Sequence, residues 1–286
     1  MPSTIDIRRR IRSVKNTQQI TKAMKMVAAA KLRRAQERMF AARPYAAALR
    51  EVLSSVATRV DATEHPLLKA HETERKVLII PITADRGLCG AFNSNVTRAT
   101  MNFLREKQFE SVELLPLGRK AFDFFKRRPI PIRRHNMHVY QALSLATAQE
   151  IAKEFIENFI SGEIDAVYVV YNEFKSLIAQ QVRVVRLLPL ERAWDEVQTV
   201  VDYLYEPSPD AILNDILPKH IEFQLYRFLL ESAAAEQGAR MTAMEAATKN
   251  ASDMIGYLTL TYNRIRQAAI TKEIIEIVSG ASAAQS

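Results

Sequence analysis

The sequence has 286 residues, with 48% hydrophobic and 25% charged residues and a formal net charge of +8 at pH 7. This composition is that of an ordinary soluble protein, and no apolar run approaches the roughly 20 residues that span a bilayer. Cys89 is the only cysteine, which excludes an intramolecular disulfide and a site of paired thiolates, and we expect no secretory signal because the first residues lack its apolar stretch.

The positive charge is concentrated at the start of the chain. Residues 1–59 contain fourteen lysines and arginines against three acidic residues, so the remainder is slightly acidic. A basic segment of this kind predicts an anionic partner, which can be nucleic acid, lipid head groups or an acidic protein surface. The alternative is that these side chains only keep a helix solvated.

Residues 1–60 are predicted to form one long helix of a coiled coil. From Ile7 onward, mostly apolar residues recur at alternating steps of four and three, and no glycine interrupts them. Ser3 or Thr4 can cap the helix, and we expect a kink or local loosening at Pro44. The seam positions are Ile7, Ile11, Val14, Gln18, Thr21, Lys25, Ala28, Leu32, Ala35, Met39, Ala42, Ala46, Leu49, Leu53, Val56 and Val60.

A linker over 61–75 is followed by a predicted α/β domain over 76–206. Strands alternating with helices form a mostly parallel, Rossmann-like sheet flanked by helices, and we expect two closing antiparallel strands after Tyr171. The predicted strands are 76–82, 111–117, 166–171 and 181–187, and the predicted helices lie near 92–107, 119–128 and 142–161.

Residues 207–286 are predicted to form the second helix of the coiled coil. Many seam residues are alanine, so the two helices can approach closely. The predicted fold class is therefore an α/β insert in a long antiparallel two-helix coiled coil. The second seam consists of Met241, Met244, Thr248, Ala251, Ile255, Leu258, Tyr262, Ile265 and Ala269.

The second helix is predicted to extend beyond the end of the first helix. If both helices leave the domain together, Met24 lies opposite Met244 and Met1 lies near Gln267. Residues beyond Gln267 then form a single helix with an apolar face that a free chain leaves exposed. We expect this face to be a bearing tip that a partner covers, made of Ile270, Ile274, Ile277 and Val278.

Signatures of nucleotide chemistry are not found in the predicted domain. Its glycines fit neither the dinucleotide spacing nor a P-loop. The segment 83–93 follows the first strand and opens a helix, where an anion can bind, but we favour a tight turn with Asn93 or Ser94 as the helix cap. His135 and His138 lack further metal ligands, and Cys89 has no obvious base. We therefore predict no catalytic residue, no metal and no cofactor.

Two long segments resemble the gamma subunits of F-type ATP synthases. The first, Ile11 to Arg33, contains KNTQQITKAMKMVAAAKL, and the second, Glu236 to Ala281, contains EQGARMTAM and YNRIRQAAITKEI. The motif DRGLCG at 85–90 is also similar to the family. The resemblance covers essentially the whole chain.

The resemblance implies a central rotor shaft without a catalytic site of its own, which couples transmembrane proton flow to ATP synthesis. The implied partners are the alpha and beta subunits of the catalytic hexamer, the epsilon subunit and the ring of c subunits. The implied location is the cytoplasmic face of a bacterial cell membrane, reached as a peripheral protein. The implied contacts are Met24 and Lys25 at the acidic lever of the catalytic subunits, and Arg240, Gln267 and Thr271 at a loop of the hexamer.

The alternative is a basic coiled-coil protein that binds nucleic acid. Such proteins often interleave aromatic side chains with their basic ones, whereas only Phe40 and Tyr45 are aromatic before residue 60. We therefore expect no nucleic acid partner. Steep salt dependence of binding to random duplex DNA would favour this alternative.

Overall fold

The structure, a computed structural model, divides the chain into two compact units. We call Met1–Val27 together with Met241–Ser286 the coil unit, and Ala28–Arg240 the domain unit. The residues that the structure describes are 3–57, 65–69, 73–140, 143–176, 179–190, 206 and 208–285.

Two long helices contribute to both units: α1 (Thr4–Ala57) and α5 (Pro209–Gln285). The expected cap at Ser3 is confirmed, because its hydroxyl accepts a hydrogen bond from the Asp6 backbone N–H at 3.1 Å. The Asp6 carboxylate accepts one in return from the Ser3 N–H at 3.3 Å, as in a capping box. α1 continues through Pro44 as one helix, although proline removes one backbone donor.

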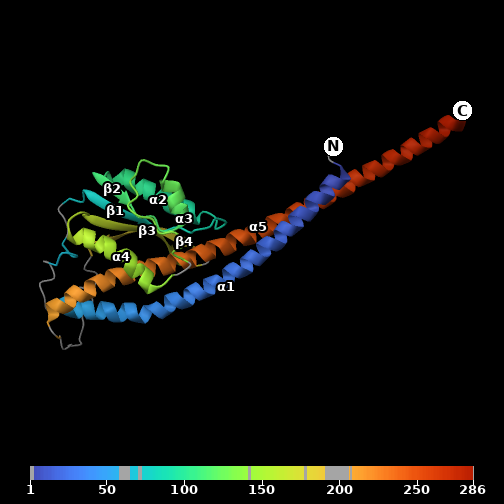
Figure 1. Cartoon of the computed structure of the whole chain (residues 1–286). Coiled ribbons are helices and arrows are strands. Elements are labelled where there is room, and N and C mark those ends of the chain that lie inside the picture. Colours follow the sequence, from blue (N-terminus) through green and yellow to red (C-terminus); the bar gives the residue numbers. More distant parts are fainter. Residues whose placement is uncertain are drawn as a thin grey trace. The chain divides into compact units, whose positions relative to one another are not determined.

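The predicted seam is confirmed on both helices, which run antiparallel in the coil unit (Figure 1). Every described seam position of α1 is buried or half-buried, and most residues between these positions are exposed. On α5 the same holds from Met241 to Ile265, whereas Ala269 is exposed. The alternation by three and four therefore marks the faces that the two helices turn toward each other.

The domain unit contains a four-stranded sheet of order β2-β1-β3-β4. β1 (Lys76–Pro81) is parallel to β2 (Ser111–Leu114) and β3 (Ala166–Phe174), and β3 is antiparallel to β4 (Gln180–Leu188). β1 is buried from its second residue onward, which explains its unbroken apolar run. The four predicted strands are confirmed; a second closing strand would fall within 191–205, outside the described residues.

Helices cover both faces of the sheet (Figure 1). α2 (Phe92–Lys107) and α3 (Arg119–Phe125) share one core with β1, and α4 (Leu145–Ile160) lies in the core on the other face. α4 begins at Ser144, whose hydroxyl accepts a hydrogen bond from the Thr147 N–H at 3.2 Å. These helices confirm the three predicted ones, with shorter ends for the second and third.

The first part of α5 belongs to the core of the domain unit. Every residue from His220 to Arg240 is buried or half-buried, as expected for a helix with neighbours on opposite sides. Its Leu225 and Phe228 share a core with Leu53 of α1 and Leu78 of β1. The coiled-coil pattern did not predict this second contact, because the sheet that provides it comes from distant sequence.

Candidate coupling surface

Side-chain contacts that join α1 to α5 in the coil unit agree on one register. They pair Thr21 with Thr248 at 2.8 Å, Lys25 with Glu245 at 2.6 Å and Arg8 with Tyr262 at 2.6 Å. The predicted register, with Met24 opposite Met244, is confirmed to within one turn of helix.

Met24 and Lys25 are two of the predicted contacts on this helix pair. Met24 is half-buried. The Lys25 ammonium pairs with the Glu245 carboxylate, and the two side chains are 34% and 59% exposed. Because solvent screens an exposed ion pair, both charges remain accessible to a partner.

Arg240, a third predicted contact, lies in the domain unit and binds its own chain. Its guanidinium donates hydrogen bonds to the Glu236 carboxylate at 2.5 Å and to the Gly87 carbonyl at 3.3 Å, and its side chain is only 12% exposed. Burial raises the pKa of Glu236, and the charge of Arg240 opposes this rise. We missed both partners in the sequence, although the four-residue spacing of Glu236 and Arg240 is typical of a helical ion pair.

The helix cap expected at Asn93 or Ser94 is wrong. α2 begins at Phe92, and its N-cap residue Ala91 makes no side-chain hydrogen bond. Asn93 binds the preceding loop instead, because its amide oxygen accepts a hydrogen bond from the Ala84 N–H at 2.9 Å. A cap prediction from residue type alone cannot distinguish these two uses of an asparagine.

Asp85 organises the rest of the DRGLCG loop. One of its carboxylate oxygens accepts hydrogen bonds from the backbone N–H groups of Arg119, at the start of α3, and of His138, at 3.0 and 3.1 Å. Cys89 is 1% exposed, and burial raises the pKa of its thiol. The polar groups of the loop therefore form hydrogen bonds within the chain. Arg240 binds the loop by donating a hydrogen bond to the Gly87 carbonyl.

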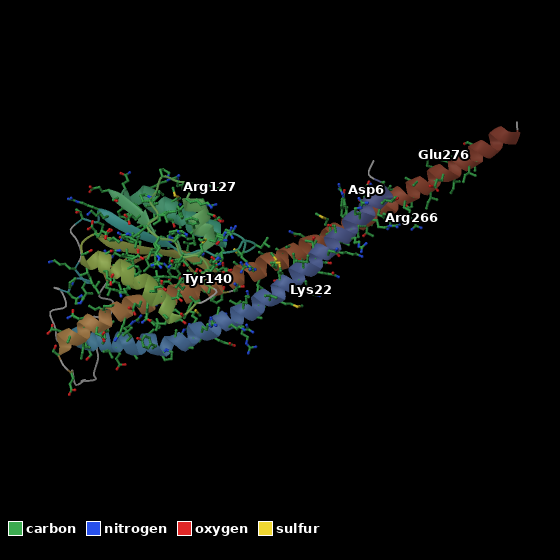
Figure 2. The ribbon with its side chains drawn as sticks, in the orientation of Figure 1. Asp6, Lys22, Arg127, Tyr140, Arg266 and Glu276 are labelled. Carbon is green, nitrogen blue, oxygen red and sulfur yellow. The ribbon has the colours of Figure 1, made fainter. Side chains whose placement is uncertain are left out.

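The last part of α5 is exposed on every side, as predicted. All residues from Arg266 to Gly280 are exposed, and Figure 2 places Glu276 on a stretch of helix that α1 does not accompany. Gln267 and Thr271 lie there, with the Thr271 hydroxyl bonded to the Gln267 carbonyl at 2.9 Å. The exposed apolar residues are Ile270, Ile274, Ile277 and Val278, together with Ile275, which we missed in the sequence.

The predicted contacts thus fall into separate places along the chain. Met24 and Lys25 are neighbours on α1, Gln267 and Thr271 are neighbours on α5, and both pairs belong to the coil unit. Arg240 belongs to the domain unit and is engaged in its core. Arg240 is therefore bound within its own chain, whereas Gln267 and Thr271 are exposed and Met24 and Lys25 are partly exposed.

The described residues include no group of three or more His, Cys, Asp and Glu side chains placed to hold a metal ion. His135 stacks on Phe122, with ring centroids 4.1 Å apart. None of the helices that the structure describes has the length and apolarity needed to cross a membrane.

An α/β domain inserted in an antiparallel helix pair, with an apolar helix end left exposed, defines a class of protein that acts through contacts with other protein chains. A family model described as ATP synthase matches residues 3–284. The chain is 52% identical to the ATP synthase gamma chain of Anaeromyxobacter sp. (strain Fw109-5), over 99% of each chain, and 53% identical to that of Solibacter usitatus (strain Ellin6076), over 100% of each. The chain belongs to the family of ATP synthase gamma chains.

Solved structures show the same fold. The chain is similar to one in the central stalk and c ring of the Tetrahymena thermophila mitochondrial ATP synthase, with a TM-score of 0.61 and 28% identity over 80% of this chain and 99% of that one. A chain of the Euglena gracilis mitochondrial ATP synthase has a TM-score of 0.68 at 23% identity, over 98% of this chain and 94% of that one.

Proposed function

We propose that the chain is the central rotor of an F-type ATP synthase and couples proton flow to ATP synthesis, and to hydrolysis, by rotating within the catalytic hexamer. The full-length identity to ATP synthase gamma chains supports this assignment. The observation that carries it is the end of α5, where apolar side chains are exposed over a stretch that α1 does not accompany. Such a surface needs a sheath from another protein.

The partners in this proposal are the alpha and beta subunits of the hexamer, the epsilon subunit and the c ring. The similar Tetrahymena chain comes from an assembly of central stalk and c ring, which supports the same arrangement here. As part of this assembly, the chain sits as a peripheral protein on the cytoplasmic face of a bacterial membrane, and the bacterial origin of its relatives supports the bacterial part of this proposal.

The coupling residues in this proposal are Met24, Lys25, Arg240, Gln267 and Thr271, and the bearing tip consists of Ile270, Ile274, Ile277 and Val278. Catalysis belongs to the surrounding hexamer, and this chain carries no catalytic site of its own. The helices over 1–60 and 207–286 form the shaft, 61–75 is a linker, and 76–206 is the foot. The comparisons give no support to a nucleic-acid-binding function.

Reconstitution tests the proposal. Membrane vesicles that contain the complete ATP synthase should pump protons when ATP is added, and vesicles whose complex was assembled without this chain should not. Adding the purified chain during assembly should restore pumping. Equal proton pumping with and without the chain would refute the rotor assignment.

A further inference from the structure

Two threonines meet across the coiled coil where the seam is otherwise apolar or long-chained. Thr21 is 8% exposed, and its hydroxyl oxygen lies 2.8 Å from that of Thr248, which is half-buried. The seam neighbours of Thr248 on α5 are Met244 and Ala251, both buried. A paired hydroxyl is therefore found at one level of the seam, and on α5 it lies between apolar residues.

The number of hydroxyl protons determines which hydrogen bonds the two threonines can form. The Thr248 hydroxyl lies 2.7 Å from the Met244 carbonyl, and the Thr21 hydroxyl lies 3.0 Å from the Gln18 carbonyl. Two hydroxyl protons can serve only two of these three contacts. The shorter two are satisfied together when Thr21 donates to Thr248 and Thr248 donates to the Met244 carbonyl.

An ion pair in the same region also favours one register of the two helices. Lys25 and Glu245 lie about one turn from the two threonines and pair at 2.6 Å. If α5 moved by one seam position along α1, Lys25 would face either Met241 or Thr248 instead of Glu245. Either shift separates the ammonium from its carboxylate partner.

Apolar packing alone distinguishes neighbouring registers only weakly within the coil unit. The seam of α5 contains small residues such as Ala251, and a narrow seam loses little apolar contact when it moves by one position. A shift by one seam position in either direction would separate the Thr21 hydroxyl from that of Thr248 and place it against Met244 or Ala251, whose side chains have no hydroxyl. In coiled coils a polar seam residue selects register in this way, at some cost in stability.

We propose that Thr21, Lys25, Glu245 and Thr248, here called the polar cluster, hold α1 and α5 in one register. The cluster acts as a set of positioning residues: it does not contact a substrate, and it keeps the two helices from sliding along each other. Apolar packing holds the helices together, and the polar cluster selects their alignment.

The test separates register from stability. In the double variant T21V/T248V, valine keeps the shape of threonine and removes both hydroxyls, so the free energy of unfolding should stay the same or rise. The matched control T21S/T248S keeps the hydroxyls. Register is measured on the full-length chain, in a Cys89→Ser background, by disulfide formation between a cysteine at Val14 and one at Ile255, Ala251 or Leu258.

The pairing of Thr21 with Thr248 places Val14 opposite Ile255, so this pair reports the native register and the other two report shifted ones. In the unmodified seam, and in the serine control, the native disulfide should dominate. In the valine variant the ratio of shifted to native disulfide should rise by about fivefold or more. An unchanged ratio in the valine variant, or shifted disulfides already equal to the native one in the unmodified seam, would overturn the proposal.

A second measurement links the cluster to the proposed rotor function and rests on that function. Complexes assembled with T21V/T248V should still hydrolyse ATP but move fewer protons per ATP, and the serine control should restore the ratio. Loosened register with normal coupling would refute this link alone. The disulfide test on the free chain does not depend on the rotor assignment, so the two failures are distinguishable.

Discussion

Lys25 carries its positive charge next to a carboxylate of its own chain. The pair with Glu245 is short, at 2.6 Å, but the two side chains are 34% and 59% exposed. Exposed pairs contribute about 0–1 kcal/mol to the free energy of unfolding. The charge of Lys25 is therefore only weakly held by Glu245 in the free chain.

Replacing Lys25 by alanine should leave ATP hydrolysis by the reconstituted complex within about twofold of the unmodified rate, because one exposed pair is worth little. Steady-state hydrolysis is the measurement. Glu245→Ala is the matched control, since it removes the same pair from the other side. Complete loss of hydrolysis in Lys25→Ala would contradict this account.

Arg240 differs from Lys25 in burial, and its replacement should act on folding. Arg240→Met leaves the Glu236 carboxylate buried without its partner and removes the bond to the Gly87 carbonyl. Breaking one side of a buried pair costs about 3–5 kcal/mol. Urea unfolding of the free chain should show a loss of this order.

Two further variants complete the Arg240 experiment. Adding Glu236→Gln to Arg240→Met removes the unpaired charge, so part of the lost free energy of unfolding should return. Lys25→Met, at the exposed pair, should cost less than about 1 kcal/mol. Equal losses for Arg240→Met and Lys25→Met would show that burial does not distinguish the arginine site from the lysine site.

At the scale of one element, α5 shows three environments along a single helix. It is packed on opposite sides from His220 to Arg240, packed along one seam from Met241 to Ile265, and exposed from Arg266 to Gly280. The exposed part lies outside the helix pair, and isolated helices of such length are marginal in water. The end of α5 should open readily in the free chain.

Amide hydrogen exchange tests this expectation. Residues 270–283 should exchange rapidly in the free chain and slowly in the assembled complex, because the hexamer is expected to sheath the tip. The segment from Met244 to Ile255, which packs against α1, should be protected in both samples. Equal protection of 270–283 in both samples would show that the tip needs no sheath.

How much of α5 could be predicted depended on where its neighbours come from. The seam from Met241 onward was visible because both helices repeat every three and four residues. The buried stretch before it was not assigned to the domain core, since its second neighbour is a sheet assembled from distant strands. In the same way Asn93 has the residue type of a cap, and only the path of the loop shows that it binds Ala84.

The candidate contacts were less predictable than the fold. Resemblance alone suggested Arg240, and its partner Gly87 is 153 residues away. The spacing of Glu236 and Arg240 is typical of a helical ion pair, which we missed, and no local pattern indicates that the pair is buried. The exposed tip was predictable because simple counting from the register places those residues beyond the start of α1.

At the scale of the whole molecule, buried titratable groups make stability depend on pH. Desolvation and the nearby charges of Arg227 and Arg50 lower the pKa of His220 from 6.5 to about 4. Between these values the unfolded chain binds a proton that the folded chain does not. The free energy of unfolding should therefore fall as pH is lowered from 6.5 to 4.

The variant His220→Gln isolates this effect. Thermal unfolding of the free chain between about pH 4.5 and 7.5 should show that the variant loses less stability on acidification, by on the order of 2 kcal/mol. Burial raises the pKa of Glu231 and Glu236, which works in the opposite direction in both proteins. The control variant His135→Gln keeps His220 and should lose as much stability on acidification as the unmodified chain. Identical pH profiles for His220→Gln and the unmodified chain would show that His220 does not cause the acid sensitivity.

The three environments of α5 should also leave three different patterns of mutational tolerance on one uninterrupted helix. Polar substitutions should be rejected on almost every face between 220 and 240, and only along the seam between 241 and 265. Between 266 and 280 the free chain should accept nearly any residue compatible with a helix. In a deep substitution scan, positions in that last stretch that nevertheless restrict growth on a non-fermentable carbon source would be restricted by the assembly alone, and they would map its contacts without a structure of the complex.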